Sequence, residues 1–375
     1  MKRVLKIFLV FIIVVIVAAA GFILTLQVFE YRPAELTVLD IENNVENVQE
    51  NYVDLSTAIT VLTFNTGYAS LSATEDFVMD GGTKGRMDSQ EEVQANVEGI
   101  SSILESAAAD IYLLQEVDTD SSRSYEIDQY AYYQDFLGYA SAFAYNYRCI
   151  FVPFPLQISQ MMGKVNSGIV TFTDFYGTDA TREQLPGSFS WPLRLANLKR
   201  CILITRYPID GSDKELIVIN VHLSAYDDGS MRTEETAALQ QVMLEEYQAG
   251  NYVLVGGDFN QTFPDAVTTT YDSANDSYSY DYLYPLKDPG YWQAFPIDGN
   301  WFDANGFIFG VDTNTPTCRL LNQPYDTVNT ENNQYYVIDG FIVSPNISIQ
   351  DVTTLDENFT YSDHNPVMIS IILNP

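Results

Sequence analysis

Polar side chains able to take part in catalysis stand beside short apolar runs that are typical of buried strands. They are Asn65, Glu116, His222, Asp258, Asn260, Asp339, Asp363 and His364. Carboxylates, carboxamides and imidazoles are costly to bury singly, because burial removes their hydration. We therefore expect these groups to converge on one site, where a cation and mutual hydrogen bonds satisfy them.

The types of donor indicate which cation this site would hold. Oxygen ligands are offered by Asn65, Glu116, Asp258, Asn260 and Asp363. Such ligands suit hard Mg²⁺ or Mn²⁺. The chain has two histidines and no cysteines at zinc-binding spacing, so a zinc site is not expected. A carboxylate such as Asp339 near His364 would fix the tautomer of the imidazole and keep it charged beside a phosphate.

Each of these motifs has an ordinary structural interpretation when it is taken alone. A Gln-Glu pair after a strand, as at Glu116, commonly begins a loop, and a Gly-Gly-Asp sequence, as at Asp258, is common in turns. His222 is equally explained as a hydrogen-bonded loop histidine, and Asp363 as a turn residue. Their joint occurrence, each beside an apolar run, favours a shared site.

The apolar runs that position these residues alternate with amphipathic segments. The runs cover residues 61–64, 111–114, 217–221, 252–255, 341–343 and 366–371. Helical spacing of apolar residues predicts helices over 91–107 and 233–249. We therefore expect sheets covered by helices. Residues 265–335 are rich in Asp, Asn, Tyr, Gly and Pro and are expected to form long surface loops.

The composition is that of one large acidic domain. With 375 residues, of which 46% are hydrophobic, the chain can bury a sizeable core, and no linker divides residues 50–375. The net charge of −32 leaves no broad basic surface for nucleic acid. A nuclease is not excluded, because a divalent metal neutralises phosphate locally. Isolated basic residues are candidates for contacting a substrate phosphate or, individually, solvated surface cations: Arg86, Arg123, Lys164, Lys199 and Arg200.

The N-terminal segment predicts a membrane anchor. Residues 7–26 are almost continuously apolar, and a helix of this length, at ~1.5 Å per residue, spans roughly 30 Å, the thickness of a bilayer core. Lys2, Arg3 and Lys6 precede the segment, so the positive-inside rule keeps the N-terminus in the cytoplasm and exports the rest. The alternative is a signal peptide cleaved at residues 18–20. The apolar run continues beyond these alanines, which favours a retained anchor.

Six ordered motifs resemble the endonuclease/exonuclease/phosphatase superfamily. They are LTFNTG (62–67), LLQEVD (113–118), INVHLSAY (219–226), GGDFN (256–260), VIDGFIVS (337–344) and YSDHNPV (361–367). The resemblance covers about residues 58–373. It implies an α/β (α+β) fold in four layers, a β-sandwich of two sheets flanked by helices. It also implies metal-dependent hydrolysis of a phosphoester, because the superfamily includes deoxyribonucleases, abasic-site endonucleases, sphingomyelinases and inositol-polyphosphate phosphatases.

The resemblance also implies roles for individual residues. Asn65 and Glu116 resemble the family's metal-site pair, with Asp363 near the metal. Asp258 resembles the residue that positions or deprotonates the attacking water. Asn260 resembles a residue that helps to hold the phosphate.

Further residues of these motifs resemble the phosphate-binding groups of the superfamily. His364, oriented by Asp339, resembles the histidine that contacts the phosphate. His222 resembles the second histidine of the deoxyribonuclease and sphingomyelinase branches, which donates a proton or binds phosphate. Asn166, in the sequence Asn-Ser-Gly, resembles a phosphate-side residue of several branches.

The expected organisation is a basic cytoplasmic leader (1–6), a transmembrane anchor (7–29), a connecting segment (30–57) and a catalytic domain (58–375). The catalytic domain would lie outside the cytoplasm on the cell membrane, or be secreted if the first segment is cleaved. Anchoring favours a substrate at the membrane, such as a lipid headgroup or a small phosphodiester, and no stable protein partner is implied. The alternatives are an extracytoplasmic nuclease and a non-catalytic binding module on the same fold.

Overall fold

The computed structural model describes residues 2–43, 52–227, 229–273 and 275–375. The α-helices are α1 (Lys2–Val28), α2 (Gln90–Ala107), α3 (Gln129–Leu137), α4 (Ser230–Gln248) and α5 (Asn300–Asn305). The strands are β1 (Leu36–Leu39), β2 (Ile59–Asn65), β3 (Ile111–Asp118), β4 (Ala140–Val152), β5 (Gly163–Thr173), β6 (Asp179–Gln184), β7 (Cys201–Pro208), β8 (Glu215–His222), β9 (Tyr252–Asp258), β10 (Val267–Asp272), β11 (Ser277–Tyr282), β12 (Ile308–Gly310), β13 (Cys318–Arg319), β14 (Tyr335–Tyr336), β15 (Asp339–Val343), β16 (Ile347–Thr354) and β17 (Val367–Leu373).

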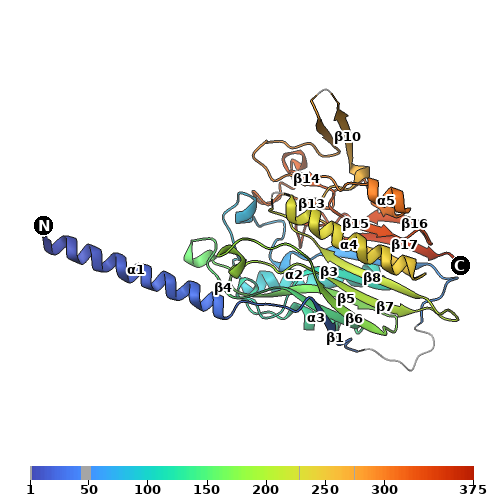
Figure 1. The fold of residues 1–375 in the computed structure, drawn as a ribbon, viewed down its shortest axis with the longest axis horizontal. Coiled ribbons are helices and arrows are strands. Elements are labelled where there is room, and N and C mark those ends of the chain that lie inside the picture. The colour runs from blue at the N-terminus through green and yellow to red at the C-terminus, as the bar shows by residue number, and fades with distance from the viewer. Residues whose placement is uncertain (1, 44–51, 228, 274) are drawn as a thin grey trace.

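Two large sheets form the centre of the molecule. Among the described residues, one sheet has seven strands in the order β1-β6-β7-β8-β9-β15-β12, and the other has six in the order β16-β17-β2-β3-β5-β4. The sheets pack face to face (Figure 1) and bury an apolar core between them. Val61 and Leu113 enter this core from the six-stranded sheet, and Leu254 and Phe341 enter it from the seven-stranded sheet.

Helices cover the outer face of each sheet. Val97 of α2 and Tyr133 of α3 are buried in the cluster that covers the six-stranded sheet. Leu239 of α4 and Phe302 of α5 are buried on the seven-stranded sheet. The order helix, sheet, sheet, helix confirms the predicted four-layered sandwich.

The helix α2 illustrates how the sequence specifies these outer layers. Ser89 caps it in a reciprocal pair: its Oγ accepts from the backbone N–H of Glu92 at 3.2 Å and donates to Glu92 Oε2 at 3.0 Å. The apolar residues at helical spacing then face the sheet, and Val93 and Leu104 are fully buried. Both predicted helices are therefore present, as α2 and α4.

The strand directions bring the predicted polar residues to one edge of the sandwich. β2 and β3 are parallel neighbours, as are β8 and β9. Because parallel strands end at the same edge, Asn65 lies beside Gln115, and His222 lies beside Asp258. β15 runs antiparallel to β9 and starts where β9 ends, which sets Asp339 beside Asp258.

Two segments differ from the expectation based on sequence. Residues 265–335 are not only loops, since they contain the hairpin β10–β11, the helix α5 and the strand β12 at the edge of the seven-stranded sheet. The hairpin is exposed on both faces, so its Thr, Ser, Tyr and Asp residues show no apolar alternation that would predict strands. Residues 30–57, expected as a connection, contribute β1, which pairs with β6.

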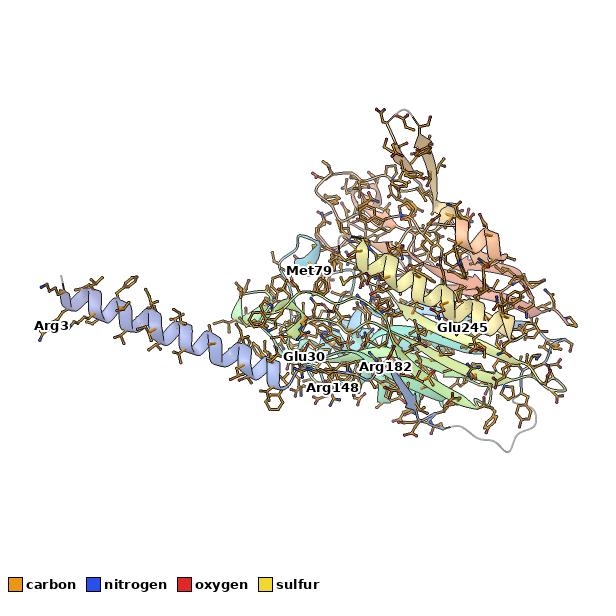
Figure 2. All side chains as sticks on the ribbon, viewed as in Figure 1. Arg3, Glu30, Met79, Arg148, Arg182 and Glu245 are labelled. Atoms are coloured by element: carbon orange, nitrogen blue, oxygen red, sulfur yellow. The ribbon has the colours of Figure 1, made fainter. Side chains whose placement is uncertain are left out.

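Helix α1 extends away from the domain (Figure 1). Figure 2 shows Arg3 near its free end and Glu30 where the chain joins the domain. With 27 residues the helix is about 40 Å long, and its side chains are exposed along most of its length. It is long and apolar enough to span a membrane or to act as a signal sequence.

Two glycines allow β9 to lie close to its neighbours. A Cβ at Gly257 would be 2.0 Å from the carbonyl oxygen of Val221 on β8. A Cβ at Gly256 would be 2.7 Å from Leu113 Cδ1 of the facing sheet. A Cβ would therefore meet backbone at Gly257 and the packed side chains of the core at Gly256, which explains the Gly-Gly pair before Asp258.

We expect Gly257→Ala to lower the free energy of unfolding by about 3 kcal/mol, because the added methyl group meets backbone rather than a movable side chain. Denaturant unfolding of the purified protein measures this change. Gly138→Ala is the control, since a Cβ there meets no atom within 4 Å. Gly138 has a positive φ of +67°, so its replacement by alanine is expected to lower the free energy of unfolding by about 1 kcal/mol. Equal losses in the two variants would contradict the steric explanation.

Candidate active site

The predicted site residues line one cleft at the edge of the sandwich, with a volume of about 740 Å³. Those that line this active-site cleft are Asn65, Glu116, His222, Asp258, Asn260, Asp363 and His364. Asp339 is hydrogen bonded to His364 at 2.9 Å. The structure therefore brings together eight of the nine residues predicted from the sequence.

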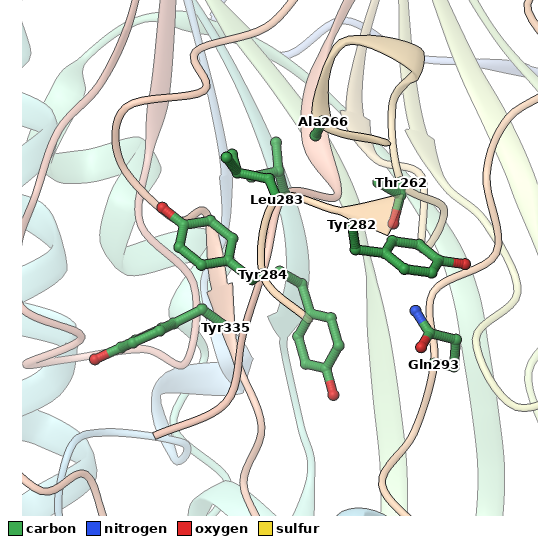
Figure 3. A pocket seen from close by; sticks show the side chains of 9 residues that line it. Thr262, Ala266, Tyr282, Leu283, Tyr284, Gln293 and Tyr335 are labelled. Atoms are coloured by element: carbon green, nitrogen blue, oxygen red, sulfur yellow. The ribbon is translucent and has the colours of Figure 1, made fainter. Parts of the chain in front are cut away.

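A second, smaller cavity lies near the base of the β10–β11 hairpin (Figure 3). Its lining includes Tyr282, Tyr284, Gln293 and Tyr335. Its volume of about 10 Å³ is that of a single water site. No carboxylate or imidazole is among the described residues that line it, so it lacks the groups for hydrolysis.

Asp258 connects most of the other site residues. Its Oδ1 accepts a hydrogen bond from the backbone N–H of Asn260 at 2.9 Å, and its Oδ2 accepts one from Asn65 Nδ2 at 3.0 Å. The same Oδ2 lies 3.5 Å from His222 Nε2. Burial, and then the Asp339 carboxylate, raise the pKa of Asp258 to about 7. Asp258 therefore exchanges a proton near neutral pH.

His364 is held in one orientation by Asp339. Its Nδ1 lies 2.9 Å from Asp339 Oδ2, which leaves Nε2 at 3.9 Å from both Asp258 Oδ2 and Asp363 Oδ2. Burial opposes a charge on this imidazole, but Asp339 and other neighbours raise the pKa of His364 well above its ordinary value. His364 is therefore a charged hydrogen-bond donor that faces the cleft.

His222 is in the opposite state. Burial, and then the charge of Arg200, lower the pKa of His222 well below its ordinary value. Arg200 lies next to His222, since its Nη1 donates to the carbonyl oxygen of His222 at 3.2 Å. The cleft thus combines a charged imidazole with a neutral one.

Glu116 reaches the cleft through a bulge in β3. The register against β5 shifts between Leu114 and Val117, and Glu116 has a φ of +55°. This left-handed conformation costs roughly 1 kcal/mol for a residue with a Cβ. Glu116 Oε1 lies 3.8 Å from His222 Nε2, and its side chain is 26% exposed, compared with 2% for Asp258. Glu116 is therefore the more accessible carboxylate for an incoming cation.

Asn65, Glu116 and Asp363 offer the donors that a hard divalent cation requires. Ser362 links two of them, because its Oγ donates to the carbonyl oxygen of Asn65 at 2.8 Å and lies 3.4 Å from Asp363 Oδ1. Burial raises the pKa of Asp363 to about 7, and repulsion from Glu116 adds to this effect. A bound Mg²⁺ or Mn²⁺ would offset both the cost of burying the Asp363 carboxylate and its repulsion from Glu116. The residues therefore fit such an ion.

Two other groups of described side chains have potential ligand atoms within 4.8 Å of one another. In the group Asp258, Asp339 and His364, two members are already hydrogen bonded to each other. In the group Cys318, Asp363 and His364, burial raises the pKa of Cys318 to about 12, so its sulfur is a neutral thiol. A thiol is a poor ligand for a hard cation. Asp363 belongs to both the second group and the predicted ligand set.

Asn166 is the one predicted site residue that is not among the residues lining the cleft or hydrogen bonded to one of the other predicted site residues. Its Nδ2 donates to the carbonyl oxygen of Asp120 at 3.1 Å, and the neighbouring Ser167 lines the cleft instead. Asn146, at a bulge in β4, also lines the cleft. Its Nδ2 is buried without a partner among the described residues, so it is available to an oxygen in the cleft. Asn146 could not be predicted from the sequence, because a bulge inside a long strand leaves no motif.

Three arginines also line the cleft. Arg123 and Arg200 are among the basic residues singled out from the sequence. Arg123 is paired with Asp118 through Nε and Nη2, at 3.0 and 2.8 Å, and is less available to a substrate. Arg319 was missed, because the two-residue strand that carries it has no periodic pattern. Its Nε is buried and has no partner in the described part of the chain.

The two histidines allow a direct test of this electrostatic arrangement, because the chain has no others. In metal-free protein near neutral pH, NMR of the ring nitrogens is expected to show one charged imidazole, His364, and one neutral imidazole, His222. Asp339→Asn is expected to lower the pKa of His364, because it removes the carboxylate that stabilises the imidazolium. His222→Asn assigns the signals. Two neutral imidazoles in the unaltered protein would contradict the arrangement.

Solved structures of other proteins share the fold of this domain. An endonuclease/exonuclease/phosphatase from Beutenbergia cavernae DSM 12333 has a TM-score of 0.56 at 16% identity, covering 84% of this chain and 72% of that one. One from Bacteroides vulgatus has a TM-score of 0.51 at 15% identity, covering 85% and 100%. ANGEL2, a 2′,3′-cyclic phosphatase in complex with adenosine-2′,3′-vanadate, has a TM-score of 0.52 at 13% identity, covering 92% and 100%.

Sequence comparison identifies the family. No curated protein matches the chain significantly. The model of the Endonuclease/Exonuclease/phosphatase family matches residues 93–364, which is more than half of the chain. This match includes most of the residues in the active-site cleft. The chain therefore belongs to the endonuclease/exonuclease/phosphatase family, whose members hydrolyse phosphoesters.

Proposed function

We propose that this chain is a Mg²⁺- or Mn²⁺-dependent phosphoesterase that acts outside the cytoplasm. The proposal depends mainly on the surroundings of Asp258. Its Oδ2 lies within 4 Å of the neutral imidazole of His222 and the charged imidazole of His364. A carboxylate base, a charged donor and an accessible carboxylate for a cation are the parts that attack of water on phosphorus requires.

In the proposed reaction, the oxygen of a water molecule bonds to phosphorus and an ester P–O bond breaks. Asp258 accepts the proton that the water loses, a role that suits its pKa of about 7. Asn65 Nδ2 and the backbone N–H of Asn260 keep this carboxylate in place. The electron pair of the broken bond stays on the ester oxygen, which leaves as an alcohol after taking a proton from solvent.

Donors in the cleft would hold the phosphoryl oxygens. His364 Nε2 would supply a charge-assisted hydrogen bond, and Asn146 Nδ2, which has no partner among the described residues, would supply a neutral one. His222, held neutral, is positioned to donate a hydrogen bond or to bind the phosphate. A divalent cation held by Asn65, Glu116 and Asp363 would polarise a phosphoryl oxygen and stabilise the negative charge that develops there.

We also propose that α1 is a retained anchor in the cell membrane, with the leader 1–6 in the cytoplasm and residues 30–375 outside it. Lys2, Arg3 and Lys6 flank one end of the helix, and acidic residues such as Glu30 follow the other, as the positive-inside rule requires. The catalytic domain 58–375 would then lie beside the membrane surface.

An extracytoplasmic nuclease is the alternative activity on the same site. It is disfavoured because a net charge of −32 repels a polyanion. A non-catalytic binding module is disfavoured because the residues predicted to be catalytic or to bind the metal lie in or next to one cleft. Hydrolysis of DNA or RNA would support the first alternative, and absence of both metal binding and hydrolysis would support the second.

Asp258→Asn is expected to lower kcat on bis(4-nitrophenyl) phosphate by roughly 10²–10⁴-fold, because the amide cannot accept the proton of the attacking water. The release of nitrophenolate in the presence of Mg²⁺ or Mn²⁺ measures this. Asp281→Asn makes the same chemical change on the exposed strand β11 and is expected to leave kcat unchanged. Full activity in Asp258→Asn would refute the assigned role.

Removal of the metal is expected to abolish hydrolysis, and added Mg²⁺ or Mn²⁺ is expected to restore it. Glu116→Gln is expected to weaken Mn²⁺ binding by at least ~10-fold, because it removes the negative charge of the most accessible ligand. Titration of Mn²⁺ followed by electron paramagnetic resonance measures binding without relying on activity. Unchanged binding in Glu116→Gln would show that this residue is not a ligand.

Mass spectrometry of the mature protein from the membrane fraction tests the anchor. We expect the intact chain, with residues 1–30 retained, and resistance to extraction by high salt. A protein that begins after residue 20 and is recovered from the medium would instead identify a cleaved signal peptide.

A further inference from the structure

The active-site cleft has a polar arm and an apolar arm. The polar arm holds the carboxylates and imidazoles described above. The apolar arm is lined by the end of α1, by loop 153–162 between β4 and β5, and by the segment 189–198. Its main side chains are Phe22, Ile23, Leu26, Phe154, Leu156 and Leu193. One continuous cleft therefore joins the proposed catalytic groups to the helix that is proposed to enter the membrane.

The end of α1 is packed against the domain as part of this cleft. Leu26 is 6% exposed and is buried in a cluster with residues of β4. The rings of Phe22 and Phe151 meet edge to face, with centroids 6.1 Å apart. Trp191 Nε1 donates to Gln27 Oε1 at 3.1 Å. The helix thus forms one wall of the apolar arm.

Ion pairs secure the chain where it leaves the helix. Glu30 Oε1 lies 3.3 Å from Lys199 Nζ and 3.6 Å from Arg194 Nε. The Glu30 side chain is 4% exposed, and those of Lys199 and Arg194 are 14% and 40% exposed. Arg194 lies in the segment 189–198 that carries Leu193, so its contact with Glu30 connects the end of α1 to a second wall of the apolar arm.

The segments beside α1 also present large apolar side chains to the surroundings. Leu156, Ile158 and Leu193 are 84%, 87% and 64% exposed, and Trp191 is 57% exposed. Exposed leucine, isoleucine and tryptophan next to a membrane-spanning helix are typical of a surface that enters the lipid interface. With α1 in a bilayer, this rim lies at the membrane surface and the apolar arm adjoins lipid.

We propose that the substrate is a lipid of the adjoining membrane, whose phosphoester group enters the polar arm while its hydrocarbon chains lie along the apolar arm. This inference rests on the proposed phosphoesterase function and specifies its substrate class. The apolar wall is continuous with α1, which favours a lipid over a water-soluble ester. The alcohol part of a water-soluble ester is small and polar and has no hydrocarbon chain to contact this wall. A nucleic acid is disfavoured because the net charge of −32 repels a polyanion.

The test compares lipid hydrolysis with hydrolysis of a soluble ester by the full-length protein in proteoliposomes. The liposomes contain phosphatidylglycerol, phosphatidylethanolamine and phosphatidate, which offer diester and monoester headgroups, and bis(4-nitrophenyl) phosphate is the soluble ester. The double variant Leu156→Gln, Leu193→Gln changes two exposed residues of the apolar arm, so folding is preserved. Val328→Gln is the matched control, since Val328 is 86% exposed and does not line the cleft.

We expect the double variant to hydrolyse lipid at least ~10-fold more slowly than the unaltered protein, because two apolar contacts with the substrate are lost. Its hydrolysis of the soluble ester, and both activities of Val328→Gln, are expected to stay within twofold. Hydrolysis of the soluble ester without hydrolysis of any of the lipids, or equal loss of both activities in the double variant, would overturn the lipid proposal alone. Failure to hydrolyse either substrate would overturn the proposed function itself.

Discussion

The hydrogen bond from Asn65 Nδ2 to Asp258 Oδ2, at 3.0 Å, joins the two sheets where the chemistry is proposed to occur. Asn65 ends β2 of the six-stranded sheet, and Asp258 ends β9 of the seven-stranded sheet. A buried carboxylate requires such partners, so this contact fixes both the edge of the sandwich and the orientation of Asp258. His222 and Asp339 are the register neighbours of Asp258 on β8 and β15, so their positions depend on the same strand.

The protonation of the cleft follows from these placements. Asp339 keeps His364 charged, whereas His222, near Arg200 and deeply buried, is neutral. Asp258 lies between the two histidines and titrates near neutral pH. A carboxyl group with a pKa near neutral, a neutral imidazole and a charged imidazole are thus present together in one site, and the proposed hydrolysis uses all three.

The parts of the fold and the site that depend on local pattern could be predicted from the sequence. Apolar runs predicted strands at 217–221 and 252–255, and the polar residues beside them, His222 and Asp258, were expected to converge because each is costly to bury singly. In the structure β8 and β9 are parallel, which sets the two residues side by side. The positions that depend on neighbouring strands could not be predicted. Asn146 enters the cleft through a bulge set by pairing with β5, and Arg319 lies on a strand of two residues. The packing of Leu26 against β4 could not be predicted either, because the sequence of an apolar helix end does not indicate whether that end packs against the domain.

This edge of the sandwich is proposed to be a cation-assisted phosphoester site. Anomalous diffraction from crystals grown with Mn²⁺ and inorganic phosphate tests it most directly. The predicted result is an anomalous peak about 2.1 Å from carboxylate oxygens of Glu116 and Asp363, with phosphate next to the ion and to His364 Nε2. Absence of a peak in the cleft, or a peak bound only by residues outside it, would contradict the claim.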